Sequence, residues 1–547
     1  MISIEAFPTI GTALFEAART WPDQPFVAVP ANPSRSYHPQ GLAWTYREVE
    51  AAVRQLATRY QAAGYGQGRR IGLLLENRPE HILHKLAMNH LGITCVPINP
   101  DYRPREMAYV IDHTRMDLVV VLDALDPLLQ QAMGETRHQP AVFRLEDADT
   151  AFPPAAQAAT VFRAQPDTIA SILYTSGTTG KPKGCMLSHR YELASGAWYA
   201  ARGGLVALEE GCERLYNPLP LFHINASVLS LFCCMLKGNC QIQPDRFQAS
   251  RWFTEVSESR ATVVHFLGVM VPILLNQTAH ALELQHQIKF GLGAGIDPQR
   301  HAEFEARFGY PLIEVWGMTE SVRLVIDADT PRKVGTRAFG RVQPGMEIQV
   351  VDDNDQPVPD GVPGELRVRH SAATPRRDCF SGYLNDPDAT QAAWHGGWLR
   401  TGDVVVRDPD GLFYFMERRK NIVRRSGENI AAAEVEAVLQ SHPAVAQAAV
   451  LAVPDEVREE EVLACVVLKG ERPKPLGPDD ALVQELLEYC NEQMTYFKVP
   501  GWLWFPDAIP ITSTQKIQKH RIFATGADPR TTPGMIDVRV QKKRSKA

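Results

Sequence analysis

The 547-residue sequence lacks the features that would place it in a membrane, in an export route or on a nucleic acid. Its most apolar stretches, such as Ser227–Leu236 and Thr262–Leu275, are too short or too interrupted to span a bilayer. No basic segment followed by an apolar core stands near Met1, so we expect no secretory signal. The formal net charge of -6 argues against a dedicated nucleic-acid binder, because such a protein needs a basic face.

The nine cysteines are scattered, without a CxxC pair or a paired framework. Cys233 and Cys234 are adjacent, and we expect them to be buried. This pattern favours free thiols and a reducing, cytoplasmic setting. Hydrophobic residues make up 45% and charged residues 22%, as is usual for a globular protein. The chain is too long for one hydrophobic core, so several domains are expected.

Through the first half, apolar strand-like runs alternate with helical patterns, which indicates α/β architecture. Strands are predicted at residues 71–75, 94–97, 119–122, 169–174, 263–266, 288–291 and 312–316, and helices at 79–91 and 106–113. The region of about residues 335–415 is rich in glycine, proline and short alternating segments. It predicts a β-barrel-like subdomain.

A compact α+β pattern follows a boundary that we place near Lys420. Helices are predicted at residues 434–441 and 480–494, and strands at 445–453 and 462–468. The sequence therefore predicts an N-terminal domain of residues 1–419 and a C-terminal domain of residues 420–525. Residues 526–547 are rich in proline and glycine and then basic, so a flexible, solvated tail is expected there.

The segment Tyr174–Gly184 reads YTSGTTGKPKG and follows a predicted strand. Its glycines let backbone N–H groups approach an anion, and its hydroxyls and lysines add donors and positive charge. A Walker loop would need G-x-x-x-x-G-K-[ST], whereas Pro182 follows Lys181 here. A polar surface turn is the alternative, but this density of hydroxyls, glycines and lysines favours a phosphate-binding loop. A helix is expected from about Ser188.

At this loop the sequence resembles the adenylate-forming superfamily, which includes acyl-CoA synthetases, nonribosomal peptide adenylation domains and luciferases. The segments 418–430 and 517–520 look most like the branch of crotonobetaine/carnitine-CoA ligases. The resemblance implies two αβα subdomains and the β-barrel-like subdomain, followed by a small mobile α+β lid domain. It also implies ATP, Mg²⁺ and coenzyme A as the molecules that the protein uses.

Later segments resemble the superfamily's nucleotide site. In EVWGMTE, residues 314–320, Trp316 stands for the usual tyrosine and offers a flat face to adenine. Thr319 is implied to bond the α-phosphate, and Glu320 with Thr175 to hold Mg²⁺. The carboxylate of Asp403, in the tripeptide TGD, is implied to accept both ribose hydroxyls. The full implied set for ATP and AMP is Thr175, Ser176, Gly177, Thr178, Thr179, Gly180, Lys181, Gly293, Ala294, Gly295, Glu314, Val315, Trp316, Gly317, Met318, Thr319, Asp403, Arg418 and Lys516.

The segment 220–225 resembles the family segment that borders the acyl pocket. His223 is implied to lie where the acyl group and the thiol meet, and a satisfied core histidine is the alternative. The implied acyl pocket is Phe222, His223, Ile224, Asn225, Gly268 and Gly291. The implied catalytic residues are Lys516, Thr319, Glu320 and His223.

In the C-terminal part, Lys516 matches the family's catalytic lysine, although Gln515 stands where a glycine is usual. Lys420 matches the hinge residue, and Gly427 is implied to face the thiol.

The resemblance implies an acid–CoA ligase: acid and ATP give an acyl-adenylate and pyrophosphate, and coenzyme A then gives the thioester and AMP. A medium, branched or cyclic carboxylic acid is expected, and a homodimer is left open. One alternative is an enzyme that loads an amino acid or aryl acid onto a carrier protein, but residues 222–226 lack the aspartate usual there. Another is a non-catalytic nucleotide-binding regulator, for which Gln515 is the only hint.

Overall fold

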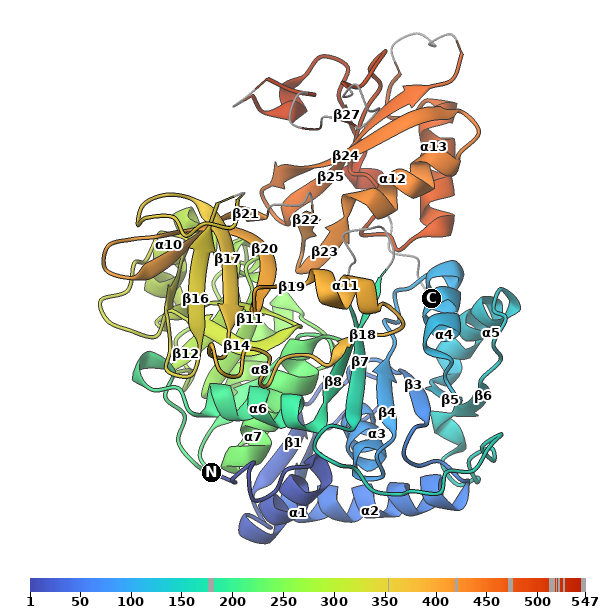
Figure 1. Cartoon of the computed structure of the whole chain (residues 1–547), viewed down its shortest axis with the longest axis vertical. Helices are drawn as coiled ribbons and strands as arrows, with labels where there is room; N and C mark the ends of the chain where they lie inside the picture. Colours follow the sequence, from blue (N-terminus) through green and yellow to red (C-terminus); the bar gives the residue numbers. More distant parts are fainter. Residues whose placement is uncertain are drawn as a thin grey trace.

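The computed structural model describes residues 1–175, 182–352, 354–418, 422–470, 476–510, 517, 519, 522–524 and 527–542; the side chains at 417, 418, 422, 429, 431 and 433 are not described. The described strands form a seven-stranded, an eight-stranded and two six-stranded sheets. The first two sheets build the lower part of the molecule, the third lies beside them, and the fourth stands above (Figure 1).

The seven-stranded sheet carries the phosphate-loop segment. Its strand order is β18(Gly382–Tyr383), β8(Lys183–Ser188), β7(Ile169–Thr175), β4(Thr94–Pro97), β3(Arg70–Leu74), β5(Leu118–Val121) and β6(Ala141–Arg144). The five strands from β7 to β6 run parallel. The apolar strand β5 is buried along its whole length, as expected for a parallel strand covered on both faces.

The eight-stranded sheet carries the segments expected at the adenine and the acyl group. Its order is β14(Ser321–Ile326), β13(Leu312–Met318), β12(Phe290–Ala294), β11(Val263–Leu267), β9(Arg214–Tyr216), β10(Cys240–Ile242), β1(Pro25–Val29) and β2(Leu42–Thr45). The strands from β13 to β1 are parallel, and the two edge strands are antiparallel. The carboxyl ends of the parallel strands therefore meet at one edge of this sheet.

Helices cover both sheets. They are α1(Ile10–Thr20), α2(Tyr46–Ala62), α3(Pro79–His90), α4(Pro104–Thr114), α5(Asp126–Gly134), α6(His189–Ala200), α7(Leu231–Lys237), α8(Trp252–Glu258), α9(Met270–Leu275), α10(Pro298–Phe308) and α11(Pro387–Ala392). Helix α6 contacts β7 and β8 of one sheet and β14 of the other, so it lies between them. Cys233 and Cys234, in α7, are buried as predicted.

One strand beside the phosphate loop was not predicted from the sequence. Strand β8 lies between the loop and helix α6, pairs antiparallel with β7 and sets Thr175 opposite Lys183. Its short apolar run is easily taken for the end of the loop. The predicted helix start is confirmed, because α6 begins at His189 and the Ser188 hydroxyl accepts a hydrogen bond from the Tyr191 N–H.

The third sheet confirms the β-rich region. It consists of β15(Ala338–Arg341), β21(Leu412–Arg418), β20(Trp398–Arg407), β17(Gly364–Arg369) and β16(Glu347–Val351), and β19(Trp394–His395) pairs with β20. Its pairs are antiparallel, as expected for short segments joined by turns.

The fourth sheet builds the small C-terminal domain. It contains β23(Glu428–Ala431), β22(Ile422–Arg425), β25(Glu459–Leu468), β26(Trp502–Trp504) and β27(Ile536–Asp537), and β24(Val445–Asp455) pairs with β25. Helices α12(Ala432–Ser441) and α13(Ala481–Gln493) contribute Val435, Leu439 and Leu486 to the core on one face of the sheet.

The chain end differs from the expected flexible tail over residues 527–542. Strand β27 pairs with β26, and Ile536 and Val538 are buried against the C-terminal domain. The ammonium of Lys542 donates to the Glu461 carboxylate, and both side chains are buried. A few apolar residues among the prolines and glycines pack against the domain. The overall composition of the segment gave no sign of them.

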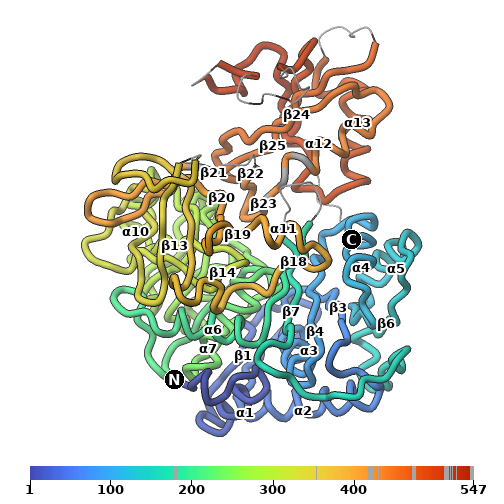
Figure 2. Tube along the Cα trace, in the orientation of Figure 1, coloured from blue at the N-terminus to red at the C-terminus, as the bar shows by residue number. Residues whose placement is uncertain are grey.

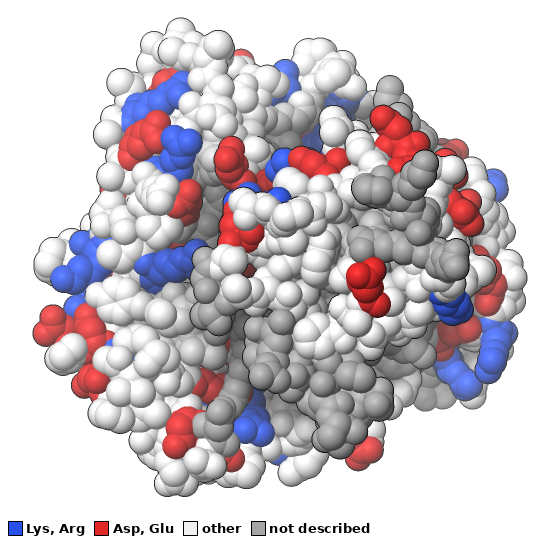
Figure 3. Space-filling model, turned by 90° about the horizontal axis from the view of Figure 1, so that it is seen from above, with Lys and Arg blue, Asp and Glu red and all other residues white. Residues whose placement is uncertain are grey.

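The C-terminal domain sits above the junction of the two lower sheets (Figure 2). On the face seen from above, described Lys and Arg side chains are interspersed with Asp and Glu (Figure 3). Among the described residues, no helix combines the length and apolar character that a membrane crossing requires.

Candidate active site

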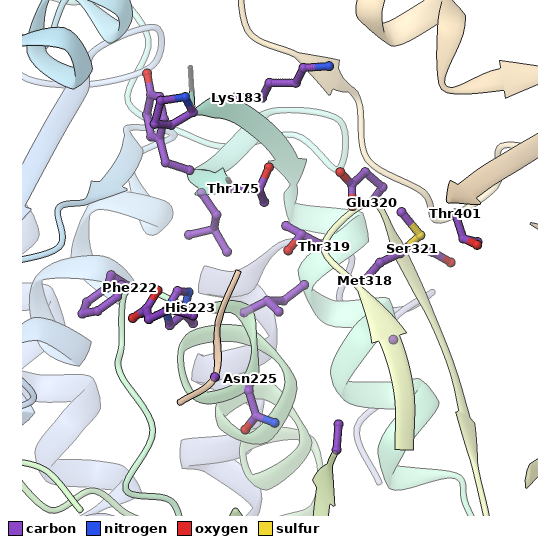
Figure 4. Close-up of a pocket in the computed structure, with 18 of the residues that line it drawn as sticks. Thr175, Lys183, Phe222, His223, Asn225, Met318, Thr319, Glu320, Ser321 and Thr401 are labelled. Carbon is purple, nitrogen blue, oxygen red and sulfur yellow. The ribbon is translucent and has the colours of Figure 1, made fainter. Parts of the chain in front are cut away.

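A cavity of about 860 Å³ lies between the N-terminal part and the C-terminal domain. It opens at the carboxyl ends of β7, β11, β12 and β13, where ligands usually bind in parallel sheets. In Figure 4, Thr175 and Lys183 lie above, Met318, Thr319 and Glu320 lie to one side, and Phe222 and His223 lie to the other. Gly427, Glu428, Glu434, Phe497 and Lys498 of the C-terminal domain complete the lining.

Thr175, Lys183 and Glu320 line the end of the cavity next to the phosphate loop. The Lys183 ammonium lies 4.7 Å from the centre of the Tyr383 ring. The Tyr383 hydroxyl donates to Glu320 Oε1 over 2.7 Å. Burial, followed by the nearby Glu320 carboxylate, raises the pKa of Tyr383 well above its usual value, so the phenol keeps its proton and remains a donor.

The donors at this end fit a Mg²⁺ ion that arrives with nucleotide phosphates. Mg²⁺ usually takes one or two carboxylates and keeps water or phosphate oxygens as its other ligands. Glu320 supplies one carboxylate, and Thr175 supplies a hydroxyl at the same end. Within the described ranges, no three acidic, histidine or cysteine side chains form a cage of their own. Phosphate oxygens would therefore have to complete the coordination.

Asp403 lies in the cavity wall with one carboxylate oxygen already engaged. The Trp316 indole N–H donates to Asp403 Oδ2 over 2.9 Å, and Arg424 Nη2 lies 3.9 Å from Oδ1. Trp316 is 6% exposed and does not line the cavity, although its neighbours Val315 and Gly317 do. The indole thus orients the carboxylate, and the stacking of Trp316 on adenine stays a prediction.

Glu314 fixes the turn after β12. Its carboxylate accepts from the backbone N–H groups of Gly295 and Ile296 over 2.7 and 3.0 Å. Burial raises the pKa of Glu314 to about 7 in spite of these two hydrogen bonds.

Glu459 of the C-terminal domain reaches the same turn. A methyl group added at Gly295 would lie 2.9 Å from Glu459 Oε1, so the carboxyl group packs against the glycine. Glu459 has a φ of +68°, which is unusual for a residue other than glycine. Burial raises the pKa of Glu459 to about 8; Arg424 opposes the shift, and Glu314 adds to it.

The segment at the acyl end leads into the π-helix Asn225–Ser230. Phe222, His223 and Asn225 line the cavity. His223 Nε2 lies 3.6 Å from Glu428 Oε1, so this side chain meets the C-terminal domain across the cavity. It is therefore not a histidine enclosed in the core.

The hairpin of β22 and β23 is the part of the C-terminal domain that enters the cavity. Gly427 lies at its turn with a φ of +84°, and a Cβ atom added there would lie 2.2 Å from Leu267 Cδ1. Lys498 anchors the same domain: its ammonium lies 2.6 Å from Glu106 of α4 and 2.6 Å from Glu434 of α12. These contacts hold the two parts of the protein together around the cavity.

The structure brings together many of the predicted site residues. Those that line the cavity are Thr175, Phe222, His223, Ile224, Asn225, Ala294, Val315, Gly317, Met318, Thr319, Glu320, Asp403 and Gly427. Gly268 and Gly291 do not line it, because they pack against Gly295 and Leu312. Residues 176–181, Lys420 and Lys516 lie outside the described residues, and the side chain of Arg418 is not described.

Sequence reasoning missed four cavity residues that have evident partners: Tyr383, Glu428, Glu434 and Lys498. Glu428 stands inside the segment 418–430, which the sequence already singled out. For Lys498 there was no local signal, because its partner Glu106 is far away in the chain.

The sequence matches the AMP-binding enzyme family over residues 14–384 and the AMP-binding enzyme C-terminal domain over residues 434–516. The fold and this match define an adenylate-forming enzyme. The chain belongs to the AMP-binding enzyme family.

Two curated relatives are CoA ligases. The chain is 30% identical to sulfoacetate–CoA ligase of Cupriavidus necator, over 95% of this chain and 98% of that protein. It is 29% identical to crotonobetaine/carnitine–CoA ligase of Proteus mirabilis, over 87% of this chain and 92% of that protein.

Among solved structures, o-succinylbenzoate CoA synthetase from Bacillus subtilis bound with a product analogue has a TM-score of 0.78 at 24% identity, covering 93% of this chain and 98% of that one. The same synthetase in complex with AMP has a TM-score of 0.64 at 24% identity, covering 94% and 98%. These likenesses concern the fold alone.

Proposed function

We propose that this chain is an ATP-dependent acid–CoA ligase of the AMP-forming kind. The observation that carries the proposal is one cavity that joins a phosphate end, a carboxylate for ribose and an acyl end, and that is closed by the C-terminal domain. Membership of the AMP-binding enzyme family and the CoA ligases among its relatives support it. ATP, Mg²⁺ and coenzyme A are the molecules that such an enzyme uses.

In the first step, an oxygen of the acid's carboxylate attacks the α-phosphorus of ATP, and pyrophosphate leaves. Charge crowds the transition state, so positioning and electrostatics should dominate catalysis. Lys183 and the loop 176–181 are proposed to hold phosphate oxygens, Asp403 the ribose and Lys516 the developing charge. Bound Mg²⁺ would neutralise phosphate charge beside Glu320. The Tyr383 hydroxyl holds the Glu320 carboxylate in place.

In the second step, the thiol of coenzyme A attacks the acyl carbonyl, and AMP leaves. The domain arrangement seen here suits this step, because Gly427 and Glu428 face His223 across the cavity. Of the described residues in the segment 517–519, neither lines the cavity: Ile517 packs on the C-terminal sheet, and the Lys519 ammonium lies 2.6 Å from Glu436. Rotation about Lys420 is proposed to exchange the two arrangements.

Separate assays of the two half-reactions test these roles. Lys516→Ala should abolish acid-dependent pyrophosphate release and spare thioester formation from a supplied acyl-adenylate. Equal loss of both half-reactions would refute the role of Lys516. Asp403→Ala should raise the KM for ATP because the ribose contact is lost, and an unchanged KM would reject that contact.

The acid itself is proposed to be of medium size, branched or cyclic, because the cavity is large and its acyl end is mostly apolar. Loading of an amino acid onto a carrier protein is less well supported, since no aspartate stands in the segment 222–226. A panel of acids with ATP, Mg²⁺ and coenzyme A, analysed for thioesters by mass, separates these readings. Nucleotide binding without acid-dependent pyrophosphate release would instead indicate a non-catalytic regulator.

A further inference from the structure

The Asn225 side chain lies at the acyl end of the cavity, and its hydrogen-bond partners determine which way its amide group is turned. Its Oδ1 atom lies 2.9 Å from Asn217 Nδ2 and 2.7 Å from His265 Nδ1. Among the described residues, none accepts a hydrogen bond from Asn225 Nδ2. Because Asn225 lines the cavity and is partly exposed, this nitrogen is available to a ligand.

A backbone N–H group determines which atoms of this hydrogen-bond network donate and which accept. The Leu219 N–H donates to Asn217 Oδ1 over 3.0 Å, so the other end of that amide must be the N–H₂ group. Asn217 Nδ2 therefore donates, and the atom of Asn225 that faces it must be the carbonyl oxygen. The opposite orientation of Asn225 would set two N–H₂ groups against each other.

The two other neighbours agree with this orientation. Asn217 Nδ2 also donates to Ser230 Oγ over 2.8 Å, and that hydroxyl passes its own hydrogen to Gln241 Oε1 over 2.8 Å. Burial lowers the pKa of His265 to about 3, so the ring is neutral and carries one N–H. His265 Nε2 lies 3.2 Å from the Tyr199 hydroxyl, and His265 Nδ1 also lies 3.4 Å from Asn217 Nδ2. A hydrogen on Nδ1 fits the shorter contact with Asn225 Oδ1, because the Tyr199 hydroxyl can then donate to Nε2.

Apolar residues from four elements line the same cavity as Asn225. Leu229 lies one helical turn further along the π-helix, and Leu267, Ala294 and Val315 stand at the carboxyl ends of β11, β12 and β13. All four line the cavity. A donor in such a wall discriminates between ligands that can accept a hydrogen bond and those that cannot.

The described charges in the cavity wall already have partners. Lys498 is paired with two carboxylates, and Arg400 lies 3.1 Å from Asp355 and 3.5 Å from Glu365. Glu428 faces His223 at 3.6 Å. Lys183 lies over the Tyr383 ring at the phosphate end. A charged tail on the acid would therefore find no uncommitted counter-ion among these groups.

We propose that Asn225 is the specificity-determining donor of the acyl pocket, and that the preferred acid has an uncharged tail with an oxygen acceptor, such as an ether, keto or hydroxyl oxygen. This inference rests on the proposed acid–CoA ligase function and names its substrate class. It sets the chain apart from relatives named for sulfoacetate and for crotonobetaine or carnitine, whose tails are charged.

The test compares kcat/KM for acids of equal length in which one methylene is replaced by an ether oxygen at successive positions. An acid with a sulfonate tail and one with a trimethylammonium tail complete the panel. The wild type should prefer an ether at one position over the plain alkanoate by about tenfold, the effect of one hydrogen bond. It should use both charged acids poorly.

Two variants of similar size separate this donor from a merely structural side chain. Asn225→Leu should remove the ether preference while the alkanoate is still used. In Asn225→Asp, one carboxylate oxygen still accepts from Asn217 and His265, but the other replaces the N–H₂ group that faces the cavity. This variant should therefore lose the ether preference and gain turnover of the trimethylammonium acid. The matched control is Asn276→Asp on the exposed end of α9, which should behave as the wild type.

The outcomes distinguish the inference from the function on which it rests. AMP formation with no ether preference in the wild type, or an ether preference that persists in Asn225→Leu, overturns the inference alone. A wild type that prefers the sulfonate acid also overturns it. No AMP with any acid in the panel overturns the proposed function and this inference together.

Discussion

Replacement of Gly427 by alanine should separate the two half-reactions. The added Cβ atom would lie 2.2 Å from Leu267 Cδ1, across the contact between the hairpin and the N-terminal part. Overpacking of this kind costs about 1–3 kcal/mol, which weakens docking of the C-terminal domain about 5- to 150-fold. The left-handed backbone at this position adds about 1–3 kcal/mol for a residue with a Cβ atom. That second cost applies in both domain arrangements, so it lowers stability without affecting docking.

Gly411→Ala is the matched control for Gly427→Ala. Gly411 has a φ of +80°, close to that of Gly427, but an added Cβ atom would have no neighbour within 4 Å. Both variants should lose similar stability in thermal unfolding. Only Gly427→Ala should slow thioester formation from a supplied acyl-adenylate, while acid-dependent pyrophosphate release stays near the wild-type rate. Equal effects of the two variants on thioester formation would refute the docking contact.

Three further predictions concern the C-terminal domain. Glu459 has a pKa of about 8 in the docked arrangement, against its usual value of 4.5 in solvent, so docking of the C-terminal domain takes up a proton. Docking should therefore weaken as the pH rises from about 4.5 to about 8. Fluorescence transfer between labels on the two domains should record this change, and Glu459→Gln should remove most of its pH dependence. Lys498→Met leaves Glu106 and Glu434 facing each other without their cation, which should slow the thioester step at least tenfold in single-turnover assays. Lys542→Met removes a partner of a buried carboxylate, so the free energy of unfolding measured in urea should fall by about 2 kcal/mol; an unchanged value would mean that the chain end does not stabilise the domain.

The sequence predicted the elements whose signals are local. The strand at residues 94–97 was placed at the bounds that the structure has, because a short apolar run between turn residues determines it locally. The segments around Thr319, Asp403 and Gly427 were placed at one site because their order resembles a known family, and they do line one cavity.

Features that depend on long-range packing were missed. The side chain of Trp316 could be assigned to a motif, but its hydrogen bond to Asp403 depends on the junction of two sheets. Strand β8 depends on pairing with β7, and the chain end depends on a sheet edge that only the folded domain provides. The contact of Lys498 with Glu106 requires the domains to be docked. A pattern along the chain cannot report such partners.

The central claim is that one cavity makes an acyl-adenylate and then a thioester, and nucleotide analysis during turnover tests it most directly. The protein should be incubated with ATP, Mg²⁺, coenzyme A and the acid panel. The nucleotides and thioesters should then be separated, identified and quantified by mass spectrometry. We predict AMP and acyl-CoA in equal amounts, with pyrophosphate released in the first step and no product when the acid is omitted. Formation of ADP and phosphate in place of AMP and pyrophosphate would contradict the account.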